Sequence, residues 1–269
     1  MATFYSDEPA RPDAPLLAGR FKLTRCIGGG SQGAAFVGRD LQDEVDVVVK
    51  MLAPADRTIE ECAAEARALI SLNSPHIVKV YGVGMDEETP WMVFEYVDGP
   101  AVQTYRQAAP FGRLPTGEAV RITLGVLAGL DECHTRGFVH GSPHQSNVML
   151  RRGLEPVLID FGRVLPIGAT DEATPTRDVA EAGQLLYTML TGHTPVVDGQ
   201  PEQLRLLEGC AGDLMDAIGV ESGVAAVALC ALNCDSALRY KDAGEMRNAL
   251  AAISGLRRRA LHRKGEQLP

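Results

Sequence analysis

The residues of this chain best suited to chemistry begin with a glycine-rich turn that reads Ile-Gly-Gly-Gly-Ser-Gln-Gly. Gly28, Gly30 and Gly33 carry no Cβ, so backbone N–H groups there can approach an anion closely. Further along, Lys50 ends an apolar strand-like run, and Glu65 lies on a helical face that also carries leucines. A cradle of N–H groups followed by a cation and a carboxylate indicates a clamp for phosphate groups.

The position of the turn in the chain helps to identify the kind of phosphate-binding fold to which it belongs. Dinucleotide-binding folds place the same Gly-x-Gly-x-x-Gly spacing between a strand and a helix. Here strand-like runs at 21–27 and 34–40 flank the turn, and a third follows at 45–52. The sequence therefore argues against a dinucleotide-binding domain.

The elements that must position these groups fall into two parts, of which the first is β-rich. Besides the three strand-like runs, it contains a helical segment with Cys62, Leu69 and Leu72 facing inward. Two more strands are expected at 77–84 and 91–97. An Asp-Gly-Pro sequence then punctuates the chain.

The second part is mostly helical. Its clearest helix is Thr116–Arg136, with Thr116 as the expected cap and Gly137 as the expected stop. Later helices are expected at 178–191, 201–208, 213–218, 222–233 and 242–253. We therefore expect an α+β fold with a β-rich lobe at residues 20–97 and a helical lobe at residues 98–254.

The two ends of the chain differ from these lobes. Residues 1–19 hold prolines and no periodic apolar pattern, which is typical of a flexible lead-in. Residues 255–269 are basic and weakly apolar, which is typical of a solvated tail.

Composition and charge exclude several classes of protein. Of the 269 residues, 45% are hydrophobic, so the chain can bury a sizeable core and is not globally disordered. A formal net charge of -9 argues against non-specific nucleic-acid binding. No apolar run approaches the roughly 18 residues of a membrane span, and the N-terminus lacks the pattern of a secretory signal. We expect a soluble, cytoplasmic protein.

The six cysteines are too sparse for a disulfide framework. Cys230 and Cys234 share one helical face and could present two thiolates to a metal, but no second pair and no nearby histidine completes such a site. We expect reduced thiols in apolar surroundings.

Further motifs, taken in order, resemble those of the protein kinase superfamily. The run Met-Val-Phe-Glu-Tyr-Val-Asp-Gly at 92–99 resembles the family's hinge, and Asp160 begins an Asp-Phe-Gly metal motif. The remaining matches are Cys-His-x-x-Gly-Phe-Val-His at 133–140, Asp-Val at 178–179 before the large central helix, and Arg-Tyr at 239–240 before the closing helix. Together the motifs cover residues 20–253 and resemble bacterial, eukaryotic-like serine/threonine kinases.

The resemblance implies a bilobal, protein-kinase-like fold that binds ATP or ADP with Mg²⁺ or Mn²⁺. It implies that Lys50, paired with Glu65, contacts the phosphates, and that Asn147 and Asp160 hold the metal. The positions it assigns to the adenine pocket are Ala35, Val48, Phe94 as gatekeeper, Glu95 and Val97 through backbone groups, and Met149.

The catalytic loop departs from the family pattern at its centre. Active protein kinases have His-Arg-Asp-x-Lys-x-x-Asn, in which the aspartate orients the substrate hydroxyl and the lysine steadies the transferring phosphoryl group. Here Ser142 stands in place of the aspartate and His144 in place of the lysine. Related small-molecule kinases also carry a histidine at that position, whereas a neutral serine hydroxyl cannot act as a carboxylate base. Both catalytic positions are therefore degenerate.

The segment after the Asp-Phe-Gly motif is also short. Only residues 163–177 precede Asp178, and the family's Ala-Pro-Glu motif is absent, so we expect no peptide-docking platform. Three threonines in the segment could accept phosphate from another kinase: Thr170, Thr174 and Thr176. In the family, the arginine at the position of Arg239 pairs with the glutamate of this Ala-Pro-Glu motif, which is missing here. We expect the surface near Arg239, and the helix that begins at Asp178, to be uncovered and to bind a protein partner.

Three functions are compatible with these residues. The first is a pseudokinase, a regulatory module that binds nucleotide but transfers no phosphate. The second is a weak or atypical phosphotransferase that acts on itself or on a small acceptor. The third is a protein-interaction scaffold that binds no nucleotide. Asp160 argues against the third, because an aspartate before Phe-Gly has little packing value.

Overall fold

The computed structural model of the chain describes residues 16–30, 33–53, 58–161, 164–195, 213–233 and 235–253. The chain divides into two compact units. Unit 1 holds the residues up to Asn73 together with Val78–Val97, and unit 2 holds Ser74–Ile77 and the residues from Asp98 onward. The expected lead-in up to residue 15, the expected helix at 201–208, Cys234 and the basic tail lie outside the described residues.

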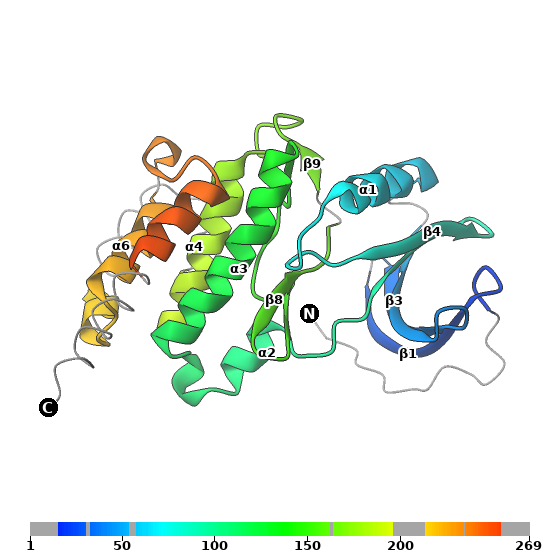
Figure 1. The fold of residues 1–269 in the computed structure, drawn as a ribbon, viewed down its shortest axis with the longest axis horizontal. Coiled ribbons are helices and arrows are strands. Elements are labelled where there is room, and N and C mark those ends of the chain that lie inside the picture. Colours follow the sequence, from blue (N-terminus) through cyan, green and yellow to red (C-terminus); the bar gives the residue numbers. More distant parts are fainter. Residues whose placement is uncertain are drawn as a thin grey trace, which may run out of the picture. The chain divides into compact units, whose positions relative to one another are not determined.

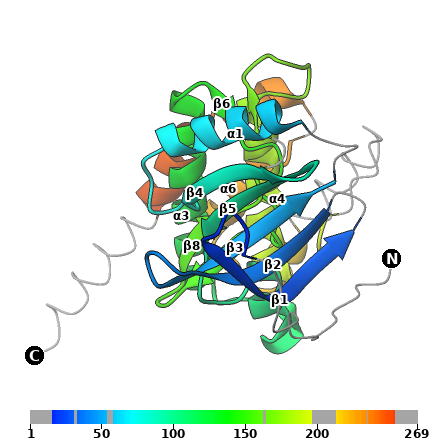
Figure 2. The ribbon, with the colours of Figure 1, turned by 90° about the vertical axis from the view of Figure 1, so that its right-hand side faces the viewer.

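Unit 1 is built on a five-stranded antiparallel sheet with the strand order β1-β2-β3-β5-β4 (Figure 2). Its strands are β1 (Phe21–Gly30), β2 (Gly33–Asp40), β3 (Val45–Leu52), β4 (Val80–Asp86) and β5 (Thr89–Glu95). Strand β4 begins later than the expected residue 77, because Ile77 belongs to unit 2, where it forms a parallel bridge with Leu158.

One face of this sheet is closed by its own apolar core. The core residues are Leu17, Phe21, Val47, Val49, Trp91 and Val93. The ring of Phe21 meets the indole of Trp91 edge-on, with centroids 6.0 Å apart. Leu17 also forms a backbone bridge with Phe21, so the fold of unit 1 includes residues that precede β1.

Helix α1 (Ile59–Ser71) packs on β4 and β5. A capping box starts it: the Thr58 hydroxyl accepts the N–H of Glu61, and the Glu61 carboxylate accepts the N–H of Thr58. Its buried residues are Cys62, Glu65, Ala66 and Leu69. Leu72, which was expected to face inward, is only half-buried because it caps the end of the helix.

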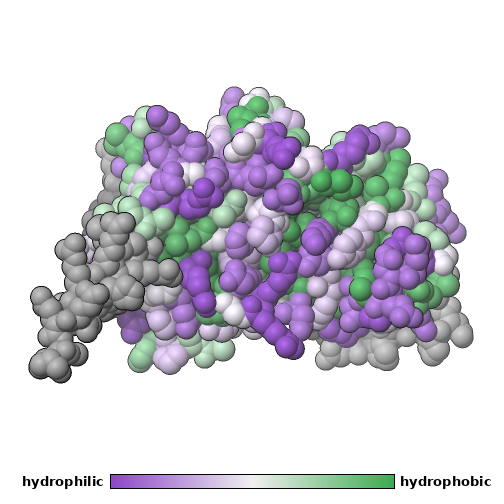
Figure 3. Space-filling view, viewed as in Figure 1, coloured by the Kyte–Doolittle hydropathy of each residue, from purple (hydrophilic) through white to green (hydrophobic). Residues whose placement is uncertain are grey.

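The surface of unit 1 carries exposed apolar side chains on α1 and on β4. Ile70 of α1 is 67% exposed and Met85 of β4 is 50% exposed. Figure 3 shows hydrophobic residues gathered over these two elements.

Unit 2 is mostly helical. Its helices are α2 (Val102–Gln107), α3 (Thr116–Thr135), α4 (Pro175–Thr191), α6 (Ser222–Ala231) and helical residues at 213–217 and 243–253. Two 3₁₀ turns join them, at Pro110–Gly112 and Ser236–Leu238. Helix α4 packs against both α3 and α6 (Figure 1). Within the described residues, no helix has the length and apolar character needed to cross a membrane.

Two small sheets of unit 2 were not expected from the sequence. One pairs β6 (Phe138–Val139) with β9 (Leu165–Pro166), and the other pairs β7 (Val148–Arg151) with β8 (Glu155–Leu158). Strand β8 lies close against α3 at Gly125, where a Cβ would come 2.4 Å from the Cγ of Pro156. A glycine at this helix position therefore lets β8 approach the helix.

The ends of two helices differ from the sequence expectation. Pro115, not Thr116, stands at the cap position of α3, and no side chain caps this helix. Its expected stop is correct, because Gly137 follows the helix with a left-handed φ of +83°. Helix α4 begins at Pro175 and not at 178, because proline suits a first turn whose N–H groups have no helical partner.

A partly buried ion pair joins Arg20, in the segment before β1, to Asp40 at the end of β2. The Asp40 carboxylate, 1% exposed, accepts hydrogen bonds from Arg20 Nε at 2.8 Å and Nη2 at 2.6 Å. The N–H of Gln42 also donates to it, at 2.9 Å. The Arg20 hydrogen bonds lower the pKa of Asp40 from 3.8 to about 2.

We predict that Asp40→Asn lowers the melting temperature at neutral pH by several degrees. Because the folded pKa lies below the ordinary value, the carboxylate's contribution is complete above about pH 4 and is lost as the pH falls toward about 2. The difference between wild type and variant, measured by thermal melts across this range, should shrink in the same interval. Asp46→Asn is the control, since this carboxylate is 56% exposed and should matter little. A difference independent of pH would contradict the assignment.

Candidate functional site

The strand register of unit 1 places the predicted pocket residues on one face of the sheet. Ala35 pairs with Lys50, and Val48 pairs with Phe94. Gly28 pairs with Ala35 in turn. Directly opposed residues of antiparallel strands point to the same side, so all five positions share a face. This face is the one opposite the Phe21 and Trp91 core, because side chains alternate along β3 and β5.

The glycines of the turn are required for different reasons. Gly33 has a φ of +120°, and a Cβ there would lie 2.0 Å from the carbonyl oxygen of Met51, so the fold itself requires this glycine. A Cβ on Gly28 would meet no atom of a described residue within 4 Å. The fold leaves room beside Gly28, and that room suits a ligand lying close to the backbone. Gly30 ends β1, where it pairs with Gly33.

The other predicted residues of unit 1 lie on regular elements. Glu65 is 5% exposed on the buried side of α1, and Lys50 is half-buried on β3. Glu95 ends β5, and Val97 is the last residue of unit 1. The pairing of Lys50 with Glu65 and the adenine contacts of Glu95 and Val97 stay predictions.

In unit 2, one carboxylate anchors the loop at residues 140–147. Asp178, fully buried near the start of α4, accepts the N–H of His140 on Oδ2 and that of Gly141 on Oδ1, both at 2.8 Å. The ring of His134 lies 2.9 Å from the same Oδ2 through its Nε2. Because the N–H of Ala243 donates to His134 Nδ1, the proton of that imidazole resides on Nε2 and is donated to Asp178. Helices α3 and α4 and the helix at 243–253 therefore meet at this carboxylate.

His140 ties the 140–147 loop to the segment that carries Asp160. Its ring is fully buried, with its centroid 4.4 Å from that of Phe161. The N–H of Ser142 donates to His140 Nδ1, so His140 Nε2 donates to the carbonyl of Ile159, at 3.2 Å. Burial lowers the pKa of His140, which keeps the ring neutral.

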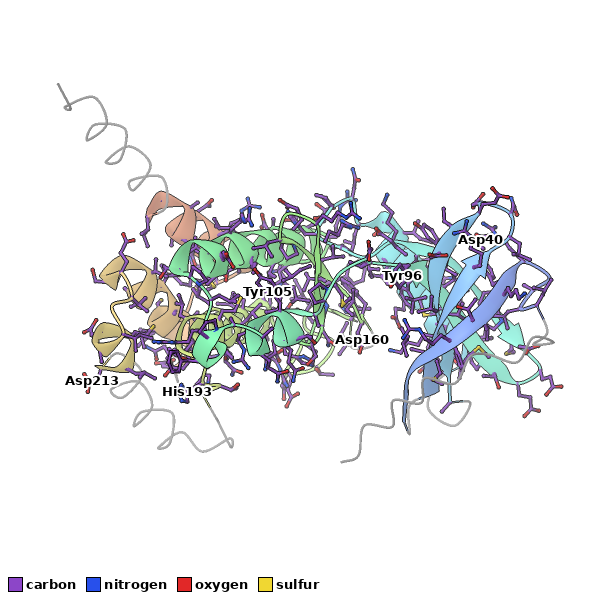
Figure 4. All side chains as sticks on the ribbon, turned by 90° about the horizontal axis from the view of Figure 1, so that it is seen from below. Asp40, Tyr96, Tyr105, Asp160, His193 and Asp213 are labelled. Carbon is purple, nitrogen blue, oxygen red and sulfur yellow. The ribbon has the colours of Figure 1, made fainter. Side chains whose placement is uncertain are left out.

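Asp160 is held in an unusual backbone conformation at an exposed position. Its φ is +60°, a left-handed value that aspartate tolerates better than most residues. Figure 4 shows Asp160 at the end of unit 2 opposite the one that carries Asp213. The next residue, Phe161, is fully buried, and the preceding Ile159 donates its N–H to the carbonyl of Asn147 at 2.9 Å. Asn147 and Asp160 therefore lie on adjacent segments.

The donor set at this place fits a hard divalent cation. Mg²⁺ prefers oxygen ligands and is bound in proteins by one or two carboxylates together with substrate phosphates. Asp160 supplies a carboxylate, and Asn147 supplies an amide oxygen that accepts no hydrogen bond from the described residues. Within the described ranges, no three His, Cys, Asp or Glu side chains cluster to hold a metal. A cation here would therefore need phosphate oxygens to complete its coordination.

The two degenerate positions lie in the same loop. Ser142 uses its backbone N–H for His140 and its carbonyl for Asn147, while its hydroxyl makes no hydrogen bond to any described residue. His144 is exposed, and its Nε2 lies 3.2 Å from Nδ2 of Asn147. Met149 follows on β7, where it forms a bridge with Ala101.

Residues of helix α2 also form hydrogen bonds to the 140–147 loop. These contacts were not predicted from the sequence. The N–H of Gln103 donates to the carbonyl of Gln145 at 3.0 Å, and the Ser146 hydroxyl donates to Gln103 Oε1. Arg106 is 8% exposed, and its guanidinium donates from Nε to Gln145 Oε1 at 3.1 Å. It also bonds the carbonyl of Gly192 after α4. A buried arginine on so short a helix has no local sequence signal, because its acceptors lie far along the chain.

The short segment before α4 contains no helix between Phe161 and Pro175 in its described part, from residue 164 on. Strand β9 pairs with β6, and the N–H of Ile167 then donates to the carbonyl of Gly137. The hydroxyls of Thr174 and Thr176 lie 3.1 Å apart, and Thr170 is exposed.

The expectation of an uncovered surface on the central helix is wrong. Every residue of α4 is buried or half-buried, since the helix packs against α3 and α6. Arg239 is half-buried and donates from Nε to the carbonyl of Asn233 at 2.6 Å. The exposed apolar residues near these segments in sequence are Leu165, Ile167 and Leu238.

Comparison with known proteins identifies the family. Residues 21–175 match the model of the protein kinase domain, so the chain belongs to the protein kinase domain family. The expected bilobal α+β kinase fold is thereby confirmed.

Bacterial serine/threonine-protein kinases are among the relatives. The chain is 27% identical to PknL of Mycobacterium tuberculosis over 90% of its own length and 67% of the relative. It is 27% identical to PknB of Mycobacterium leprae over 89% of its length and 44% of that protein. It is 30% identical to a probable serine/threonine-protein kinase of Streptomyces coelicolor over 90% of its length. The alignment covers only 40% of that relative, so the chain spans less than half of two of these three proteins.

We predict that Asp178→Asn loosens the 140–147 loop. The amide keeps one acceptor oxygen but turns an NH₂ group toward an N–H donor, which should lower the free energy of unfolding by about 1–3 kcal/mol. Urea unfolding measures this loss, and hydrogen exchange of the His140 and Gly141 amides should quicken. Asp171→Asn, at an exposed position before α4, is the matched control. Unchanged exchange at His140 and Gly141 would contradict the anchoring role.

Proposed function

We propose that this protein is a pseudokinase, a regulatory module that binds ATP or ADP with Mg²⁺ or Mn²⁺ and transfers no phosphate to protein. One observation carries the proposal. The 140–147 loop is fully anchored by Asp178 and by the contact of His140 with Phe161, yet a neutral Ser142 stands at the position of the base. The loop therefore keeps an ordered, hydrogen-bonded backbone and lacks only the carboxylate that active kinases have at the position of Ser142.

Nucleotide binding is supported by residues of both units, each taken by itself. In unit 1, the room beside Gly28 suits phosphate oxygens, and Lys50 shares its sheet face with Val48 and Phe94. In unit 2, Asn147 and Asp160 offer the oxygens that a divalent cation needs, and the cation when bound neutralises phosphate charge.

The absence of transfer follows from the chemistry of Ser142. A serine hydroxyl stays neutral at physiological pH, so it can neither accept the proton of an acceptor hydroxyl nor orient it by charge. Loss of a general base typically costs about 10²–10⁴-fold in rate. Within its described part, the short segment before α4 holds no helix, and its one strand, β9, is two residues long and pairs with β6, which leaves little backbone on which a peptide substrate could dock.

We further propose that the module acts through a protein partner bound to its C-terminal lobe. Leu165 and Ile167, 38% and 42% exposed, present apolar area on the segment that precedes α4. Replacement of Leu165 or Ile167 by glutamate should reduce co-purification of this partner, and unchanged co-purification would count against the surface.

We predict that ADP with Mg²⁺ or Mn²⁺ raises the melting temperature. A ligand at roughly 100 times its dissociation constant stabilises a protein by about 2.7 kcal/mol. Lys50→Ala, Asp160→Asn and Gly28→Ala should each reduce the shift, whereas Lys22→Ala, at an exposed position of β1, should not. No shift with millimolar nucleotide in either metal would overturn the proposal and favour a nucleotide-free scaffold.

We predict that Ser142→Asp restores slow phosphotransfer to the protein itself or to a small hydroxyl acceptor, by orders of magnitude over wild type. Transfer to added protein substrates should stay absent, because the short segment is unchanged. Radiolabelled phosphate transfer measures both, with the Ser142→Asp, Asp160→Asn double variant as control. Robust phosphorylation of an added protein by wild type, abolished by Asp160→Asn, would instead show an active kinase.

A further inference from the structure

The hydrogen bonds of Asn147 determine which way its amide faces. One end of the amide lies 3.1 Å from the carbonyl oxygen of Ser142, which can only accept a hydrogen bond. That end must therefore be Nδ2, and the carbonyl Oδ1 must be the other end. Asn147 is 9% exposed, and Oδ1 is not among the buried atoms shut off from both solvent and partners. Because Oδ1 accepts no hydrogen bond from the described residues either, it is not fully buried.

The same assignment determines the state of His144. Its Nε2 lies 3.2 Å from Nδ2 of Asn147, an atom that can only donate. The imidazole nitrogen must therefore be the acceptor, so His144 is neutral and carries its proton on Nδ1. Two acceptors, the Ser142 carbonyl and His144 Nε2, then hold the two N–H bonds of one amide group.

We propose that His144 is a positioning residue, which orients Asn147 so that Oδ1 faces the metal of the bound nucleotide. The proposal rests on the proposed nucleotide-binding function and adds a role for the residue that replaces the family's lysine. A flipped amide would turn Oδ1 toward two acceptors and an N–H toward the cation, and both changes are unfavourable.

A lysine at this position would act in the opposite direction. Its ammonium group has three donors and no acceptor, so it could not receive the N–H of Asn147. A lysine that reached the amide would attract Oδ1 and favour the flipped orientation. Restoring the residue usual in active kinases should therefore weaken metal binding in this chain.

The test compares ADP affinity with Mn²⁺ and with chelator, by isothermal titration. The dissociation constant with chelator, divided by the dissociation constant with Mn²⁺, measures how much the metal strengthens ADP binding. Substitutions of outer residues that orient a metal ligand typically cost 10–100-fold in metal affinity. We expect a loss of about 10-fold in this ratio for His144→Lys and for His144→Leu. His144→Gln, which keeps an acceptor oxygen, should stay close to wild type.

Ser146→Ala is the matched control, because this exposed loop residue bonds Gln103 and makes no hydrogen bond to Asn147. It should leave the ratio unchanged. A wild-type ratio in His144→Lys, or an equal loss in the Gln and Leu variants, would overturn the positioning role.

A second measurement needs no nucleotide and separates this inference from the proposed function. Long-range ¹H–¹⁵N spectra, recorded above the ordinary histidine pKa of about 6.5, report which ring nitrogen carries the proton. His144, assigned by comparison with His144→Gln, should show a protonated Nδ1 and an unprotonated Nε2. A proton on Nε2 would overturn the inference even if nucleotide binds. If wild type shows the expected tautomer but does not bind ADP, the proposed nucleotide-binding function is overturned, and so is the role of His144 in metal binding. The orientation of Asn147 would still stand.

Discussion

The buried carboxylate of Asp178 is the group on which the arrangement of the 140–147 loop depends. It accepts the N–H groups of His140 and Gly141 and the imidazole proton of His134, whose other nitrogen accepts the N–H of Ala243. A charge with almost no exposure must have such partners, since an unsatisfied buried carboxylate is strongly unfavourable. The side chain at position 142 takes no part in this network. Replacement of the family's aspartate by serine therefore removes a base without removing an anchor, so the loop can stay folded without a catalytic carboxylate.

Unit 1 depends on a different constraint, the antiparallel register of its sheet. Pairing of Ala35 with Lys50 and of Val48 with Phe94 gathers the predicted pocket residues on one face, while the core of Phe21 and Trp91 closes the other. A slip of one residue would exchange the two faces. Gly33 helps to prevent such a slip, since only glycine fits its φ of +120° beside the Met51 carbonyl.

The sequence predicted the family, the five strands of unit 1 and the long helices, because strand alternation, helical periodicity and motif order are local signals. The start of α1 also had a local signal, the Thr58 and Glu61 capping box, which the sequence reasoning overlooked. The long-range contacts had none. Arg106 joins Gln145 to Gly192, and Ile77 leaves β4 to pair with Leu158, through partners that periodicity cannot identify. The expectation that α4 is uncovered failed for the same reason, because it followed from a missing motif and not from the packing of α3 and α6.

Whether this protein holds ATP without transferring its γ-phosphate can be measured by ³¹P spectra of ATP with Mg²⁺, recorded over hours with a stoichiometric amount of wild-type protein. All three phosphorus signals should shift or broaden on binding and then persist, with neither inorganic phosphate nor a phosphoprotein signal appearing. Signals identical to those of free ATP would contradict binding, and steady conversion of the γ signal into a phosphoester would contradict the absence of transfer.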